Sequence, residues 1–257
     1  MYKLRAMVDM AELHLETVIP PHSSILLVGP PGSGKTELAI SLAKKWITQG
    51  ERTLFVTISA SGEDLIERLQ PDAEKEDIES VLRIIDCYVP QSNASDSRII
   101  VNTNGIAHLE SISLAISTVV DSLGTPVRII VDGMSSLFLY NAPQTMSKFV
   151  QVLSTKTKLE YGSIMFIIVD GMHESLTMNT MMSLVDGVVD IREDESLRRC
   201  VRIRYLKGTK VDPRWFDYLL ESGEAVFIEA QDMPSGCFGS EAGANQIASG
   251  DRKGGFN

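Results

Sequence analysis

The sequence lacks the marks of membrane-spanning, disulfide-rich and zinc-binding proteins. No apolar run approaches the roughly 20 residues that a bilayer-spanning helix needs, and the first residues contain no apolar stretch typical of a secretory signal. The 3 cysteines are far apart without Cys-x-x-Cys spacing, and the 4 histidines are scattered. These absences argue against a membrane span, a disulfide framework and a zinc site, and they predict a cytoplasmic protein with reduced thiols.

Positive charge is also in short supply. Among 257 residues, 24 are Lys or Arg and 34 are Asp or Glu, which gives a formal net charge of -10. This balance argues against broad, nonspecific attraction to nucleic acid, although it leaves room for a local basic patch. Apolar residues make up 44% of the chain, enough for a sizeable core, and the length predicts one α/β domain with an appendage.

A phosphate-binding loop is the most informative feature that is present. Its residues, which match the pattern G-x-x-x-x-G-K-[ST], are Gly29, Pro30, Pro31, Gly32, Ser33, Gly34, Lys35 and Thr36. An apolar strand precedes the loop and a helical stretch follows it, as this motif requires. The glycines let backbone N–H groups face phosphate oxygens, Lys35 supplies charge to the outer phosphates, and the Thr36 hydroxyl is expected to ligate Mg²⁺. The chain is therefore predicted to bind a nucleoside triphosphate.

Strand-like and helical segments alternate along the rest of the chain. Apolar strand-like runs occur at 53–58, 81–87, 127–131, 163–169 and 187–191, and helical spacing occurs at 36–49, 107–123 and 145–161. This alternation predicts a mainly parallel sheet with helices on both faces. From Arg199 the apolar period becomes two, which predicts short antiparallel strands at the C-terminal edge of the sheet. Residues 229–257 are rich in Gly and Ser, and we expect them to form a flexible tail.

A second nucleotide-binding signal ends one of the predicted strands. Asp132 directly follows the apolar run 127–131. In phosphate-loop proteins, an acidic residue at such a position holds Mg²⁺ or a magnesium-bound water opposite the hydroxyl of the loop. Asp132 and Thr36 are therefore the predicted magnesium ligands.

Together, these motifs resemble the KaiC-like branch of the RecA superfamily, which is close to archaeal RadA-type recombinases. The similarity is carried by residues 26–36, 53–66, 129–137, 184–188 and 204–209 and covers about residues 20–228. It implies one RecA-like domain over residues 1–228, with ATP or ADP as ligand. It also implies rings or filaments of identical or paralogous subunits, in which the nucleotide lies near a subunit junction.

The chain departs from this family where the hydrolytic base is expected. The family typically has a pair of glutamates at the positions of Ser59 and Ala60. Neither of these side chains can take a proton from the attacking water, and a missing general base costs about 10² to 10⁴ in rate. We therefore expect slow or absent ATP hydrolysis. Glu63 is the nearest carboxylate, and it is either a replacement base or a first-turn helix residue stabilised by the helix dipole.

Two further positions are singled out by the resemblance. Asp170 follows the strand 163–169, where the family often has a polar residue that senses the γ-phosphate; the alternative is a solvated strand end. The family's Lys-x-Arg-Gly-Thr segment, which reaches a neighbouring subunit's nucleotide, reads Tyr205-Leu-Lys207-Gly-Thr209 here. Lys207 is thus the inter-subunit candidate, although lysine lacks the bidentate fork of arginine.

The residues around Lys207 include the basic cluster of an otherwise acidic chain. This cluster is either a solvated strand face or a surface for an acidic partner, a neighbour's nucleotide or DNA, and it consists of Arg198, Arg199, Arg202, Arg204, Lys207 and Lys210.

Three functions follow from these observations. The first is an ATP-binding switch or assembly factor with slow hydrolysis, the second a working KaiC-like ATPase, and the third a RadA-paralogue-type mediator of DNA recombination. The acidic charge and the lack of a recognisable N-terminal DNA-binding module argue against the third.

Overall fold

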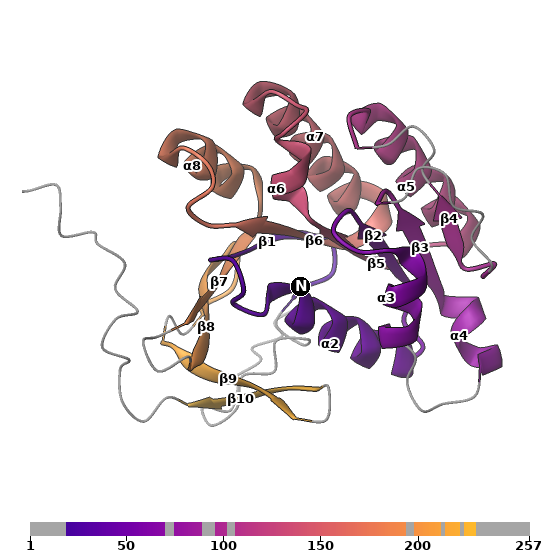
Figure 1. Cartoon of the computed structure of the whole chain (residues 1–257), viewed down its shortest axis with the longest axis horizontal. Coiled ribbons are helices and arrows are strands. Elements are labelled where there is room, and N and C mark those ends of the chain that lie inside the picture. The colour runs from indigo at the N-terminus through magenta and orange to yellow at the C-terminus, as the bar shows by residue number, and fades with distance from the viewer. Residues whose placement is uncertain are drawn as a thin grey trace, which may run out of the picture.

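A single mixed sheet runs through the middle of the molecule and carries helices on both faces (Figure 1). The computed structural model describes residues 19–69, 75–88, 96–101, 106–193, 198–211, 214–221 and 224–229. Helices α2, α3 and α4 cover one face of the sheet, and α5, α6, α7 and α8 cover the other. The predicted α/β fold class is confirmed.

The strands are joined in the order β10-β9-β8-β7-β1-β6-β5-β2-β3-β4. All pairs from β7 to β4 are parallel, and β8, β9 and β10 are antiparallel to their neighbours, as the sequence predicts. Their bounds are β1 Ser23–Gly29, β2 Thr53–Thr57, β3 Leu82–Asp86, β4 Ile99–Val101, β5 Val127–Asp132, β6 Gly162–Val169, β7 Gly187–Glu193, β8 Arg199–Leu206, β9 Phe216–Glu221 and β10 Glu224–Glu229.

The helices agree less closely with the periodicity of the sequence. Their bounds are α2 Lys35–Thr48, α3 Gly62–Leu69, α4 Lys75–Val81, α5 Leu109–Leu123, α6 Met134–Leu137, α7 Pro143–Lys156 and α8 Ser175–Leu184. The helix predicted over 145–161 ends at Lys156, and its last turn widens into the π-helical segment Thr157–Tyr161. Val81, which the sequence places in a strand, is the last residue of α4, so that predicted strand starts one residue too early.

Both faces of the central strands are buried, and this explains their continuous apolar runs. On β1, Ile25 and Leu27 point into the core shared with α2, whereas Leu26 and Val28 point into the core shared with α5 and α7. Because these strands are parallel, their carboxyl ends lie at the same end of the sheet. The phosphate loop and Asp132 both lie at that end.

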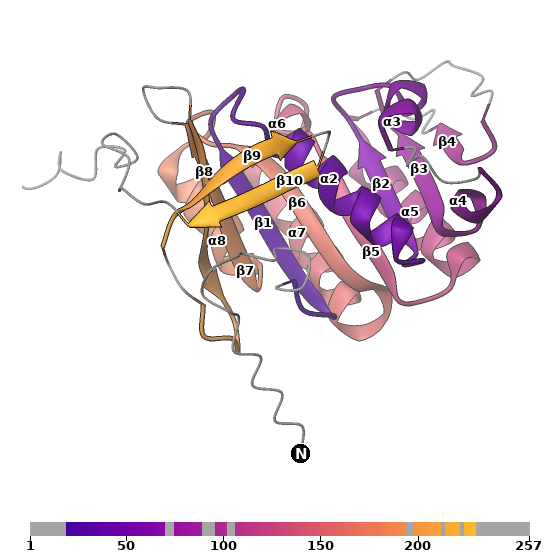
Figure 2. The same cartoon turned by 90° about the horizontal axis from the view of Figure 1, so that it is seen from below.

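The antiparallel end of the sheet folds over α2. Figure 2 shows β9 and β10 crossing this helix. The Ala225 backbone N–H donates a hydrogen bond of 2.7 Å to Ser41 Oγ on α2. Tyr218 and Phe227 stack beside it with ring centroids 5.9 Å apart. The helix that follows the phosphate loop is thus enclosed between the parallel strands and this hairpin.

Some expectations concern residues outside the described parts of the chain. Residues 230–257 of the predicted tail lie there, as do residues 1–18 of the predicted domain. Glu229, which the sequence assigns to the tail, is the last residue of β10. No helix in the described residues has the length and apolarity to cross a bilayer.

The hairpin contact with α2 is tested by replacing Ser41 with alanine. Ser41 is 1% exposed, so the substitution leaves the Ala225 N–H buried without its acceptor. We expect the free energy of unfolding to fall by about 1 to 3 kcal/mol in urea denaturation. Ser183→Ala is the control, because its exposed hydroxyl only donates to the Thr180 carbonyl oxygen within α8. Equal effects of the two substitutions would contradict this account of the hairpin.

Candidate nucleotide-binding site

The phosphate loop leads from the end of β1 into the first turn of α2. Gly32 and Gly34 have φ angles of 76° and 85°, a left-handed conformation that glycine adopts without strain. A Cβ atom on Gly29 would lie 2.8 Å from the Ile191 carbonyl oxygen, so the base of the loop leaves no room for a side chain. The loop therefore has the turned backbone and the helix N-terminus that bind phosphate groups.

Lys35 lies inside this loop. Its ammonium group donates hydrogen bonds to the carbonyl oxygens of Gly29 at 2.9 Å and Pro30 at 2.7 Å. Burial lowers the pKa of Lys35, and the nearby carboxylates of Asp132 and Asp170 act in the opposite direction. The loop thus holds a partly desolvated positive charge, which favours the binding of an anionic ligand, and the two carboxylates keep this lysine charged.

Asp132, at the end of β5, accepts hydrogen bonds from two hydroxyl groups. Thr36 Oγ1 and Ser59 Oγ each donate a hydrogen bond of 3.0 Å to Asp132 Oδ2. Burial raises the pKa of the Asp132 carboxyl, and these two hydrogen bonds oppose the rise. A poorly solvated carboxylate with two hydroxyl oxygens beside it forms a set of hard donors that fits Mg²⁺. The structure thus places Ser59 next to both predicted magnesium ligands, a contact that the sequence pattern does not indicate.

The turn that carries Ser59 is fixed at both ends. Thr57 Oγ1 donates to the Ala60 carbonyl oxygen at 2.8 Å and accepts from the Ala60 N–H at 3.2 Å. Beyond the turn, the buried carboxylate of Asp86 accepts the Gly62 N–H at 2.7 Å. The positions where the family has its glutamates are therefore well ordered, but they carry a hydroxyl and a methyl group.

Glu63 lies in the first turn of α3, with its side chain exposed. The Ser61 hydroxyl accepts the Asp64 N–H at 3.2 Å and thereby caps the start of this helix. An acidic residue in a first turn interacts favourably with the helix dipole. This placement gives Glu63 a structural reason to be there that does not involve catalysis.

Asp170 lies beside the loop and carries an ion pair. Its backbone N–H donates to the Gly29 carbonyl oxygen at 2.8 Å. Its Oδ2 lies 2.7 Å from Nη1 of Arg192, the penultimate residue of β7. Asp170 is therefore more than a solvated strand end. The sequence signal for Arg192 is only its place at the end of the run 187–191.

Two residues of the antiparallel strands form one wall of the loop. Arg199 Nη2 donates to the Gly32 carbonyl oxygen at 3.5 Å, and the Tyr218 hydroxyl donates to the Gly34 carbonyl oxygen at 3.3 Å. Burial raises the pKa of Tyr218 well above its ordinary value, so the phenol stays protonated and donates. Sequence reasoning placed Arg199 in the basic cluster and did not single out Tyr218, because β8 and β9 approach the loop only after folding.

Lys207 lies near the start of β1, whereas its own phosphate loop follows the end of β1. Its Nζ donates to the Val185 carbonyl oxygen at 2.7 Å and lies 3.7 Å from Asp186, whose Oδ2 accepts the Ser24 N–H. Because Ser24 and Gly29 are at opposite ends of β1, the separation is roughly 15 Å or more at about 3.3 Å per residue. Lys207 therefore does not belong to the site of its own chain.

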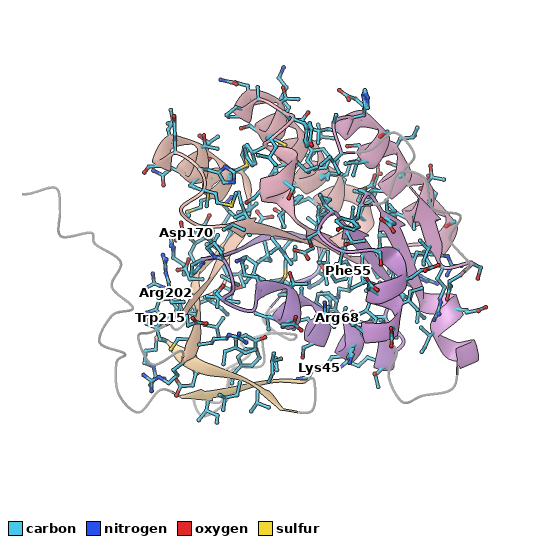
Figure 3. All side chains as sticks on the ribbon, in the orientation of Figure 1. Lys45, Phe55, Arg68, Asp170, Arg202 and Trp215 are labelled. Carbon is cyan, nitrogen blue, oxygen red and sulfur yellow. The ribbon has the colours of Figure 1, made fainter. Side chains whose placement is uncertain are left out.

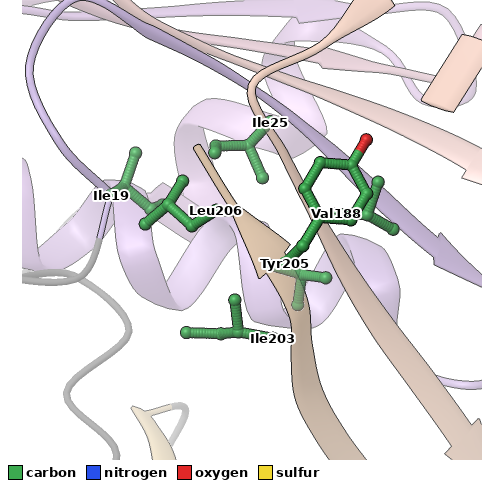
Figure 4. A pocket seen from close by; sticks show the side chains of 7 residues that line it. Ile19, Ile25, Val188, Ile203, Tyr205 and Leu206 are labelled. Atoms are coloured by element: carbon green, nitrogen blue, oxygen red, sulfur yellow. The ribbon is translucent and has the colours of Figure 1, made fainter. Parts of the chain in front are cut away.

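Tyr205, at the position where the family has its other cation, is turned inward. Its hydroxyl donates to the Met182 carbonyl oxygen, and its ring lines a small apolar pocket with Ile25, Val188 and Leu206 (Figure 4). This position has a packing role here.

The predicted basic cluster is divided by the fold. Arg199 contacts the phosphate loop and Lys207 contacts the far edge, whereas the two arginines between them bind one buried carboxylate. Asp190 is 1% exposed and accepts from Arg202 Nε at 2.9 Å and Arg204 Nη2 at 2.7 Å. Arg202 also lies 4.5 Å over the Trp215 ring; Figure 3 labels both residues and Asp170. The cluster seen in the sequence is therefore spread along β8, with its members in three different settings.

A parallel sheet with a phosphate loop after β1 and a buried aspartate at the end of β5 defines a phosphate-loop nucleotide-binding protein of the RecA type. The family model described as "ATPase: KaiC" matches residues 7–232 of this sequence. The chain belongs to the KaiC ATPase family.

Two known proteins show how far the similarity extends. The fold resembles the crystal structure of the KaiC-like protein PH0186 from Pyrococcus horikoshii OT3, with a TM-score of 0.65, 20% identity, and coverage of 81% of this chain and 90% of that one. A protein of insertion sequence IS5376 from Geobacillus stearothermophilus, described as ATP-binding, is 37% identical over 73 residues. That match covers 28% of each chain, so this chain spans little more than a quarter of that relative.

Replacing Lys35 with alanine tests the loop as the phosphate site. Each charge-assisted hydrogen bond from the ammonium contributes about 1.5 to 3 kcal/mol, so the affinity for MgATP is expected to fall at least tenfold in isothermal titration. Lys44→Ala, near the other end of α2, should leave the affinity unchanged. Equal affinities of Lys35→Ala and the unmodified chain would show that the loop is wrongly assigned.

Proposed function

We propose that this chain is a nucleotide-dependent switch or assembly factor that binds MgATP and hydrolyses it slowly. The observation that carries the proposal is the hydrogen bond of 3.0 Å between Ser59 and Asp132. It places a hydroxyl group beside the predicted metal ligand, at a position where an ATPase of this family typically has a carboxylate. The site keeps the groups that bind a triphosphate, and the turn 57–60 beside Asp132 carries no carboxylate that could activate water.

The binding half of the proposal rests on the loop and on Asp132. Thr36 and Asp132 would hold Mg²⁺, with Ser59 beside them, and the bound ion would neutralise charge on the phosphates. Lys35 exchanges its contacts with Gly29 and Pro30 for the outer phosphates. The loop N–H groups and the first turn of α2 bind the remaining phosphate oxygens.

The slow-hydrolysis half rests on the turn after β2. Neither a serine hydroxyl nor the Ala60 methyl group accepts a proton from water near pH 7. Glu63 is exposed on α3, where it stabilises the helix start. Relative to an ordinary turnover of about 10 s⁻¹, the loss of a base leaves roughly 0.1 to 0.001 s⁻¹. Cleavage then removes bound ATP only slowly, as a switch that responds to ATP occupancy needs.

Assembly through a nucleotide at a subunit junction is the third part of the proposal. Lys207 is 55% exposed and lies far from its own loop, so a second copy or a paralogue is the subunit whose nucleotide it can approach. It has to give up its contacts with Val185 and Asp186 to do so. Both this competition and the lack of a guanidinium fork make it a weak catalytic cation, which agrees with a role in assembly.

Restoring a carboxylate tests the hydrolytic half. The unmodified chain is expected to turn over ATP below about 0.1 s⁻¹, and glutamate at position 59 or 60 should raise this rate tenfold or more. Ala60→Glu should change the affinity for ATP little, because the added group acts on water rather than on the phosphates, whereas Ser59→Glu also removes the hydroxyl that donates to Asp132. Steady-state phosphate release and titration with a non-hydrolysable analogue measure the two quantities.

Glu63→Gln is the control for the base. If Glu63 only stabilises the start of α3, this substitution leaves the residual turnover almost unchanged. A turnover near 10 s⁻¹ that collapses in Glu63→Gln would show a working ATPase with Glu63 as its base. Turnover that rises strongly with DNA, and binding that weakens steeply with salt, would favour the recombination mediator instead.

Self-association is tested by sedimentation of the chain with ADP, with a non-hydrolysable ATP analogue and without nucleotide. Nucleotide can drive assembly only if it binds the assembled state more tightly, so we expect larger species with the analogue. Lys207→Ala should reduce this shift, whereas Lys210→Ala, an exposed neighbour, should not. A monomer under all three conditions contradicts assembly of identical subunits.

A further inference from the structure

We propose that Arg192 is the residue that distinguishes ATP from ADP in this chain, as a γ-phosphate ligand donated by β7 and oriented by Asp170. This inference rests on the proposed function, since it names the side chain that detects the third phosphate at the same site. It changes the role that the resemblance suggests for Asp170, which becomes the positioning residue, while Arg192, which the sequence does not single out, becomes the sensor.

The sheet places Arg192 next to the phosphate loop. β7 pairs with β1 in parallel, and continuing the register from Val28 and Asp190 puts Arg192 beside Pro30. The backbone of Ile191 packs directly against Gly29 at the base of the loop. Arg192 is thus the first side chain of β7 beyond this close contact, at the edge of the sheet where phosphate groups bind.

Asp170 connects the guanidinium of Arg192 to the base of the loop. Its N–H donates to the Gly29 carbonyl oxygen at 2.8 Å, and its carboxylate lies 2.7 Å from Arg192 Nη1. The same carboxylate favours the charged form of Lys35, so it is electrostatically coupled to the group that serves the outer phosphates. The side chains of Asp170 and Arg192 are each 28% exposed, and an incoming anion can therefore reach the pair.

Electrostatics decides which partner of this ion pair can bind a phosphate. An ionised carboxylate accepts hydrogen bonds but donates none, and a phosphate oxygen is also an acceptor. Direct contact between Asp170 and a γ-phosphate would therefore be repulsive and would favour ADP. A guanidinium has five N–H donors in a planar fork that matches phosphate geometry. Arg192 can retain Asp170 through Nη1 and still donate to the γ-phosphate.

The other candidate residues for a γ-phosphate contact are placed less favourably than Arg192. Tyr205 is turned into a pocket, and Lys207 is held by Val185 and Asp186 at the far edge of the sheet. Arg199 contacts the part of the loop that leads into α2, and it pairs with Glu193 rather than with Asp170. Among the arginines of the described residues, Arg192 is therefore the one coupled to the carboxylate beside Lys35.

The test compares the affinities for Mg-ADP and for a non-hydrolysable Mg-ATP analogue by isothermal titration. Arg192→Gln is expected to reduce the preference for the ATP analogue by about tenfold to a hundredfold, with the affinity for ADP almost unchanged. Arg202→Gln is the matched control, because Arg202 is 31% exposed and also ion-paired, but with Asp190. It should keep the nucleotide preference of the unmodified chain.

Asp170→Asn separates the two roles within the pair. Asparagine keeps a carbonyl oxygen for the guanidinium and removes the negative charge, so the preference for the ATP analogue should persist. The inference is overturned if Arg192→Gln binds both nucleotides with the ratio of the unmodified chain. An unmodified chain that binds neither nucleotide would overturn the proposed function as well, so the two failures are distinguishable.

Arg192→Lys covers the case in which Arg192→Gln loses ADP binding too, as a damaged loop would. Lysine keeps the charge next to Asp170 but cannot form the fork. Recovery of ADP binding with a reduced preference for the ATP analogue supports the inference. Recovery of both affinities at the original ratio overturns it, because the geometry of the guanidinium would then be irrelevant.

Discussion

Asp132 is held almost completely out of water at the end of β5, and most of the site is arranged around that buried carboxylate. Two hydroxyl groups, from Thr36 on α2 and Ser59 after β2, donate to the same oxygen. Lys35 adds a positive charge that is itself desolvated. A buried charge without such partners would be strongly destabilising, so the phosphate loop, β5 and the turn after β2 have to meet at one point.

The C-terminal hairpin packs against the helix that starts at this meeting point. β9 and β10 fold over α2, and Ser41 and Tyr218 connect them to the helix and to Gly34 of the loop. A helix that starts at a phosphate loop is thereby packed against both the parallel strands and the antiparallel end of the sheet. This arrangement fixes the direction of the helix N-terminus before any nucleotide binds, which lowers the entropic cost of binding.

Most of the charged groups on the antiparallel strands are used within the chain. Asp190 pairs with Arg202 and Arg204, and Asp186 pairs with Lys158 and Lys207. These cations therefore compensate the charge of two buried carboxylates. These pairs place the four cations at specific carboxylates, and they do not form one continuous basic patch along β8. Arg192 differs because its partner Asp170 lies beside the phosphate loop, where a ligand brings additional negative charge.

The sequence by itself determined the fold class, the phosphate loop and Asp132, because each depends on local patterns. Apolar periodicity marks the buried strands, and glycine spacing specifies a turn that few other residues can form. The sequence also shows that Ser59 and Ala60 stand where carboxylates are typical, since that comparison needs no coordinates. It missed α4, α6, α8 and β4, which are short or weakly periodic, and it indicated α3 only through the alternative that Glu63 lies in a first helical turn.

The tertiary structure alone decided which of the remaining polar residues share a site. Ser59 contacts Asp132 across 73 positions, and Arg192 reaches Asp170 only because β7 and β6 flank β1. β8 separates residues that are neighbours in sequence, so that Arg199 lies at the loop and Lys207 at the opposite edge. A strand rises about 3.3 Å per residue, so basic residues that are close in sequence are spread along the full length of β8.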